Sequence, residues 1–241
     1  MAVQIHYEIA AMIFMLAATL VFSHQRHLRV YRSSLFFWLM LLGVATAVCD
    51  VFCGIVMYHS VPGWLGVIVQ SAFLIASMVY SVIYSLYAME LLHRLDYIYV
   101  HRVLWCIPFV IGITAIVITP FTDLLYRFDA NGVFYKNGWY YLVAGICIVY
   151  ILVPLLLMQK VSFVSRRIKK WIVAIPVAVV MAKVFEYTVF PNFLFAYAVN
   201  SVMVFCCYLF LQNSDYYMDE VTGFFKMHGF EETVREKMAY K

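Results

Sequence analysis

Long apolar stretches alternate with short polar connections along the chain, and this pattern recurs seven times. A helix that crosses the hydrocarbon core of a bilayer needs about 20 mostly apolar residues. The stretches of this length are residues 5–23, 34–57, 65–91, 103–121, 139–158, 171–190 and 194–212. Pro191 and Asn192 predict a tight turn between the last two, because proline interrupts a continuous helix. The pattern therefore predicts an all-α membrane protein, a bundle of seven transmembrane helices.

The composition agrees with a membrane bundle and excludes a water-soluble enzyme. Apolar and aromatic residues make up 66% of the chain and charged residues 12%, whereas a soluble domain has about 45 to 50% and about 25%. We expect residues 1–212 to form the bundle and residues 213–241 to form a separate cytoplasmic segment. The connections are too short to hold a catalytic domain, so we expect no enzymatic activity from this chain.

The basic residues predict how the bundle is oriented. Fourteen of the 17 Lys and Arg residues lie in the connections 24–33, 92–102 and 159–170 and in the C-terminal tail. Cytoplasmic loops carry the excess of Lys and Arg, so the N-terminus is expected outside and the C-terminus in the cytoplasm. The first basic residue, Arg26, follows the first apolar stretch, which therefore reads as a permanent span and not as a signal peptide. Basic loops of this kind face anionic lipid, so we expect no nucleic-acid partner.

Six polar residues within the predicted spans are the candidate ligand-binding residues. An ionisable side chain inside a membrane is costly and usually faces the bundle interior or a water-filled cavity. The spacing places all six in about the outer third of the bilayer, at 1.5 Å per residue: Glu8, Asp50, Gln70, Lys183, Glu186 and Asn200. Two compatible interpretations remain open, a buried polar network that fixes helix packing and a pocket for a small external or membrane-borne ligand.

Residues 122–138 form the only sizeable external connection. Asn131 and Gly132 are a strong hairpin signal, and the residues on either side are rich in aromatic side chains and Val. We predict a short external β-hairpin between the fourth and fifth spans that acts as a lid, with Phe128, Asn131, Gly132 and Phe134 as the lid residues. The alternative is a simple turn whose aromatic rings rest on lipid headgroups.

Catalytic and metal-binding patterns are not found in the sequence. All six cysteines fall within predicted spans, where cysteine behaves as a small apolar residue. No phosphate-binding loop, carboxylate pair or Ser/His/Asp pattern is present. We therefore expect no metal, no cofactor and no catalytic residue in this chain.

The C-terminal segment contains a short motif that follows closely on the last span. It reads Asp219-Glu220-Val221-Thr222-Gly223-Phe224 and continues to Phe230. This stretch resembles the start of GGDEF domains, the diguanylate cyclase fold, with the pattern D-x-[LV]-T-G-[LF]-x-N-R-x-x-F. Asp219, Thr222, Gly223 and Phe230 match, whereas Lys226 and Met227 replace the usual Asn-Arg pair. The layout of the membrane part is similar to the seven-helix N-terminal region of some bacterial sensor histidine kinases.

The resemblance implies a signalling protein of the bacterial inner (plasma) membrane. A complete GGDEF domain would use GTP and magnesium to make cyclic di-GMP and would be active as a homodimer. This sequence ends before the GGDEF signature loop, so we expect the segment alone to make no cyclic di-GMP. It is either a piece of a longer protein or a truncated relative.

We therefore expect a membrane sensory input module that passes a signal through its last helix to a cyclic di-GMP output domain. The alternative from another class is a small secondary transporter with a Lys183, Glu186 and Asp50 site. Such transporters usually show repeated halves and broken helices near mid-membrane, whereas these charges lie toward one face. A retinal-binding photoreceptor is a weaker third option. By comparison with that family, the lysine that forms the Schiff base with retinal belongs on the last helix, and the last predicted span contains no lysine.

Overall fold

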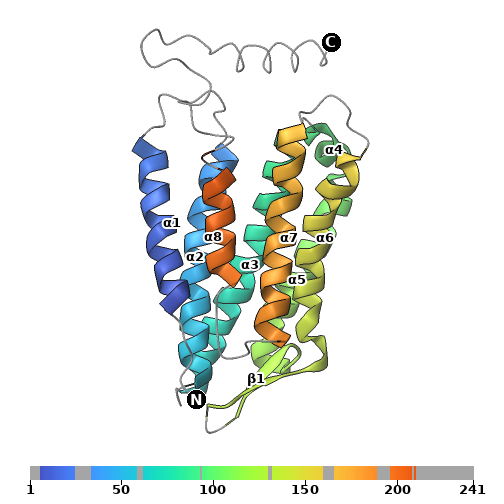
Figure 1. Ribbon diagram of the computed structural model, residues 1–241. Coiled ribbons are helices and arrows are strands. Elements are labelled where there is room, and N and C mark those ends of the chain that lie inside the picture. The colour runs from blue at the N-terminus through green and yellow to red at the C-terminus, as the bar shows by residue number, and fades with distance from the viewer. Residues whose placement is uncertain are drawn as a thin grey trace.

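The computed structural model describes residues 6–24, 34–58, 62–92, 94–129, 132–159, 166–188, 196–207 and 209. In chain order its elements are α1 (His6–His24), α2 (Ser34–Tyr58), α3 (Gly63–Leu91), α4 (Leu95–Val100), α5 (Arg102–Thr122), β1 (Tyr126–Phe128), β2 (Phe134–Lys136), the 3-10 helix η2 (Gly138–Tyr140), α6 (Tyr141–Met158), α7 (Arg166–Thr188) and α8 (Ala196–Cys207). The long helices lie side by side in one bundle, with β1 at one end and α4 at the other (Figure 1).

The described chain is mostly helical, and each of the predicted apolar stretches overlaps one of its helices. Four stretches are long and apolar enough to cross a membrane: Ser34–Val56, Gly63–Leu91, Arg102–Thr122 and Gly138–Met158. The prediction of a mostly helical chain is confirmed, and so is that of helices long and apolar enough to cross a membrane. The predicted turn at Pro191 and Asn192, and the whole segment 213–241, lie outside the described residues.

Two connections differ from the sequence prediction. The predicted loop 92–102 contains a short helix, α4, which has Asp96 in its first turn; an acidic side chain there interacts favourably with the helix dipole. α7 begins at Arg166, five residues before the predicted span, because a helix continues past the hydrocarbon as long as its backbone hydrogen bonds are satisfied. Apolar windows mark where a helix is buried in lipid and not where its backbone stops being helical.

The helix α3 lies at the centre of the packing. It contacts α2, α4, α5, α6 and β1. Its side chains enter both of the buried clusters found among the described residues. Tyr87 belongs to the cluster of α1, α2, α3, α7 and α8 and packs on Phe36 at a ring distance of 5.2 Å. Met78 belongs to the cluster formed with α5, α6 and the hairpin.

The hairpin is fixed at its turn and at its base. β1 and β2 pair antiparallel, with Phe128 opposite Phe134. Gly132 has a φ of 77°, a conformation that glycine adopts without steric cost. At the base, the side chain of Asn137 donates a hydrogen bond to the carbonyl of Asp123, which ends α5 in the left-handed conformation. These contacts hold the two strands in one register.

Candidate functional site

The six candidate ligand-binding residues lie in different helices. Asp50, Gln70 and Asn200 are buried in α2, α3 and α8. Asp50 lies one helical turn before Cys53, whose Sγ donates to the carbonyl of Val69 on α3 at 3.7 Å. Glu8 lies in α1 and both Lys183 and Glu186 lie in α7, but their side chains lie outside the described part of the structure.

Gln70 and Asn200 have different partners. Gln70 Nε2 donates to the hydroxyl of Tyr140 at 3.1 Å, close to the hairpin end of the bundle. Asn200 Oδ1 accepts from the hydroxyl of Tyr80 at 2.9 Å. Gln70 and Tyr80 are separated by ten residues, or about 15 Å along the axis of α3. The structure therefore does not bring Gln70 and Asn200 together in one polar site.

Tyr80, the partner of Asn200, belongs to a polar seam on α3 that sequence reasoning missed. We define the α3 seam as Ser77, Tyr80, Ser81, Tyr84 and Ser85. The three serines recur every four residues, so they share one helix face, and small polar residues at this spacing allow close packing of membrane helices. This serine spacing is the sequence signal that would have identified the seam.

Two members of the α3 seam donate hydrogen bonds to backbone carbonyls of neighbouring helices. Ser85 Oγ donates to the carbonyl of Tyr150 at 2.6 Å, and the Tyr84 hydroxyl donates to the carbonyl of Ile172 at 2.7 Å. Each carbonyl lies four residues before a proline, Pro154 in α6 and Pro176 in α7. Proline has no N–H, so the carbonyl four residues earlier loses its partner within the helix. Two adjacent residues of α3 thus satisfy the carbonyls that both prolines leave free.

A small cavity adjoins this seam. It has a volume of about 30 Å³ and is lined from α3, α6, α7 and α8, with Tyr80, Tyr84 and Asn200 among its lining residues. This volume equals about one water molecule's share of the liquid. Almost all of its exposed lining is apolar, and the cavity as described is too small for a metabolite.

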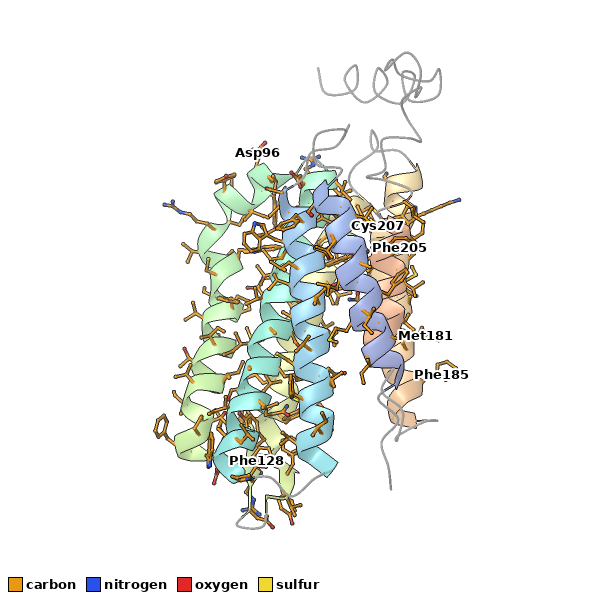
Figure 2. The ribbon with its side chains drawn as sticks, turned by 90° about the vertical axis from the view of Figure 1, so that its left-hand side faces the viewer. Asp96, Phe128, Met181, Phe185, Phe205 and Cys207 are labelled. Atoms are coloured by element: carbon orange, nitrogen blue, oxygen red, sulfur yellow. The ribbon has the colours of Figure 1, made fainter. Side chains whose placement is uncertain are left out.

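α8 contacts α3 at two positions along the helix axis. Besides Tyr80 and Asn200, the hydroxyl of Tyr87 lies 3.7 Å from Sγ of Cys207. The two contacts are seven residues apart on both helices, so α3 and α8 run parallel in a two-turn register. Cys207 and Phe205 lie on α8 near the α4 end of the bundle, far from Phe128 of the hairpin (Figure 2). α3 therefore connects the hairpin end with the C-terminal end of α8.

The predicted lid packs directly on α3. Tyr126 is 1% exposed, and its hydroxyl lies 2.6 Å from Ser71 Oγ and donates to the carbonyl of Val67 at 3.2 Å. Burial raises the pKa of the Tyr126 hydroxyl, and the hydrogen bond with Ser71 offsets part of this rise. The Phe128 ring lies where a side chain at Gly66 would stand, 2.6 Å from an ideal Cβ position. The inner face of the hairpin thus caps the first turns of α3.

The aromatic rings of the hairpin form a continuous cluster above α3. Phe128 and Phe134 are 5.3 Å apart, and Phe134 lies 6.0 Å from Tyr140, the partner of Gln70. Lys136 Nζ lies 5.0 Å from the centre of the Tyr140 ring. Of the predicted lid residues, Phe128, Gly132 and Phe134 therefore lie in this cap, and Asn131 lies outside the described residues.

The remaining sequence predictions concern metal binding and the C-terminal motif. Among the described residues, no group of three or more His, Cys, Asp and Glu side chains could hold a metal ion. Asp219, Thr222, Gly223 and Phe230 lie outside the described residues. No protein-family model, curated protein or solved structure matches this chain. The site is therefore interpreted from its own geometry.

Proposed function

We propose that this chain is the sensory input module of a bacterial signalling protein, built from seven spans of the inner membrane. The N-terminus is outside and the C-terminus is in the cytoplasm. Arg94 and Arg102 flank α4, whereas the hairpin is at the opposite end of the bundle (Figure 1). The excess of basic residues near α4 supports a cytoplasmic location for that end.

The observation that carries the proposal is the double contact between α3 and α8. α8 precedes the segment that resembles the start of a GGDEF domain. Its contacts at Tyr80–Asn200 and Tyr87–Cys207 join it to the helix on which the hairpin rests. A change in the packing of α3 therefore alters the partners of α8. These contacts support a route from the hairpin end of α3 to the C-terminal end of α8.

The signal is a small external or membrane-borne ligand, and the output is cyclic di-GMP. A ligand shifts such a bundle only if it binds one arrangement of the helices more tightly than the other. We propose the α3 seam as the element that changes, because the carbonyls four residues before Pro154 and Pro176 take their hydrogen-bond donors from α3 and would lose them if α3 moved. GTP and magnesium are required only if a complete GGDEF domain follows this chain. The proposal also includes the homodimer that the resemblance to that domain implies.

The test measures cyclic di-GMP in cells after a complete diguanylate cyclase domain is grafted in register at Asp219. Tyr80→Phe removes only the hydroxyl that binds Asn200, and Lys183→Met tests the predicted outer site. We expect each variant to change the output about fivefold or more, the lower end of typical coupling between sites. Thr122→Ala is the matched control, because that hydroxyl bonds within α5.

Unchanged output in both variants, with normal membrane insertion, would contradict the proposed route.

The same protein in vesicles separates a sensor from the transporter alternative. Uptake of protons or of a solute that depends on Lys183 would favour the transporter. A bundle without flux, whose seam variants change cyclic di-GMP, supports the sensor.

A further inference from the structure

A short segment at the opposite end of the bundle from the hairpin is weakly packed. This segment, which we call the flap, is residues 95–104, that is, α4 and the first residues of α5. No residue of α4 is buried. Tyr99, Val100, Val103 and Leu104 are between 67% and 77% exposed. Among the described residues, few contacts therefore fix the flap in its present position.

A second cavity separates the flap from α6. It has a volume of about 140 Å³, with Tyr97, His101 and Leu104 of the flap on one side. Val149 and Val153 of α6 line the other side. At about 30 Å³ for each water-sized group, this space can receive an aliphatic side chain. The flap therefore has room to move towards α6.

The hydrogen bonds of the α5 backbone are interrupted one turn after the flap. Pro108 lies inside α5 and lines the same cavity. It has no N–H, so the carbonyl of Leu104 loses its partner within the helix. The next carbonyl, that of Trp105, accepts from the hydroxyl of Tyr150 on α6 at 2.6 Å, and the N–H of Phe109 donates to the same hydroxyl. A proline and an inserted side chain are both established causes of helix bending, and here they coincide.

Tyr150 gives this bending point a fixed support. Its side chain is 2% exposed, and its carbonyl accepts from Ser85 of α3 at 2.6 Å. Its ring also contacts the Trp105 ring edge-on at 5.3 Å, so α5 is held at Trp105. Within the flap, His101 Nδ1 donates to the carbonyl of Tyr97 and the two rings stack. These last contacts join flap residues to each other, so they do not resist a movement of the flap as a unit.

We infer that the flap closes onto α6 by bending α5 at Pro108. Leu104, which is 67% exposed in the present position, then packs against Val153 inside the cavity. Filling the space gains van der Waals contacts that its walls now lack, and such packing contacts drive the association of helices in membranes. The movement depends neither on the proposed topology nor on the signalling output.

Oxidative cross-linking of the full chain in membrane vesicles tests the movement. Leu104→Cys and Val153→Cys place one thiol on each side of the cavity, and Cys106→Ser removes a neighbouring thiol. We expect an intramolecular disulfide when the flap closes, since the bond needs Cα atoms within about 7 Å. Pro108→Ala restores a helix hydrogen bond that bending must break, so the disulfide should form about fivefold more slowly. Pro120→Ala is the matched control, because Pro120 interrupts the same helix away from the flap.

Slower cross-linking with Pro108→Ala than with Pro120→Ala supports the hinge. The absence of a disulfide, or an equal rate with both proline variants, overturns it. Val103→Cys paired with Val153→Cys should not cross-link, because Val103 does not line the cavity. Equal cross-linking of that pair would show general disorder of this end and would also overturn the inference.

Hydrogen exchange gives the answer if the double-cysteine protein fails to fold. It compares residues 101–109 in the wild type and in Pro108→Ala, both with their native cysteines. The Trp105 N–H donates to the carbonyl of His101 at 3.0 Å, and we expect its exchange to slow when bending is suppressed. Unchanged exchange in Pro108→Ala contradicts the hinge. None of these outcomes depends on the cyclic di-GMP assay.

Discussion

α3 and α5 are both long and apolar enough to cross a membrane, yet they take opposite positions in the bundle. α3 is surrounded by other elements, and Ser85, Tyr87 and Met89 are fully buried. α5 lies at the periphery, where Phe121 is 87% exposed, and much of its apolar surface faces outward. Since both helices are apolar, hydropathy does not separate the central helix from the peripheral one.

The hydroxyl groups of the two helices explain the difference. In α5, Thr119 and Thr122 donate to carbonyls of their own helix, at Ala115 and Ile118. In α3, Ser81 also donates within its own helix, to Ser77, but Tyr84 and Ser85 donate to carbonyls of α7 and α6. A hydroxyl that donates within its own helix fixes no other element, whereas one that donates to a carbonyl of another helix fixes the position of that helix. The predictions below test this distinction, from the largest expected effect to the smallest.

Ser85→Ala should have the largest effect. It leaves the buried carbonyl of Tyr150 without a partner, because Pro154 has no N–H to offer, and the expected cost is about 1 to 3 kcal/mol of unfolding free energy. Reversible unfolding in mixed micelles measures it. In a Pro154→Ala background the helix regains its own N–H, so the cost of Ser85→Ala should shrink. An unchanged cost in that background would show that the freed carbonyl is not the cause.

Tyr84→Phe should cost less, about 0.5 to 1.5 kcal/mol. It removes the donor to the Ile172 carbonyl, but Tyr84 also lines the cavity of about 30 Å³. That space has about the size of one water molecule, and a water that enters it in the variant would give the Ile172 carbonyl a new partner. The same unfolding assay with Pro176→Ala completes a double-mutant cycle. A cost larger than that of Ser85→Ala would contradict the role of the cavity.

The hairpin should loosen from α3 at high pH. Burial raises the pKa of Tyr126 in the folded state, so the neutral form is favoured there relative to an unfolded tyrosine with a pKa of about 10. The stability contribution is complete below about pH 10 and falls as the pH rises toward the folded-state pKa. Hydrogen exchange at the strand amides, measured from pH 8 upward in the wild type and in Tyr126→Phe, checks this. Identical alkaline profiles for both proteins would refute the assignment to Tyr126.

Substitution on the outer face of α5 should have the smallest effect. Val110→Leu changes a side chain that is 58% exposed, and we expect a change within about 0.5 kcal/mol. The micelle unfolding assay used for Ser85 measures it. A loss above 1 kcal/mol would mean that this face packs against protein, and the contrast with α3 would fail.

The sequence predicted the helices well and their partners poorly. Apolar length located α2, α3, α5 and α6 to within a few residues, because a helix in lipid must satisfy its backbone internally. The segment in which the sequence predicts two strands contains β1 and β2, on either side of Gly132. The sequence also marked Gln70 and Asn200 as buried polar groups, but it placed them at one depth. The structure gives them partners about 15 Å apart along α3.

The α3 seam shows why the contacts between helices could not be predicted from the sequence. The positions of Pro154 and Pro176 already determine which two carbonyls lose their intrahelical partners, since that relation spans only four residues. The donors come from 65 and 88 residues away, and no local pattern specifies such a pairing. The sequence by itself therefore determined a helical chain with stretches long and apolar enough to cross a membrane, and the backbone carbonyls that lack an intrahelical partner. Only the tertiary structure decided that α3 provides it, because helices of equal hydropathy are sorted by packing and by polar contacts between them.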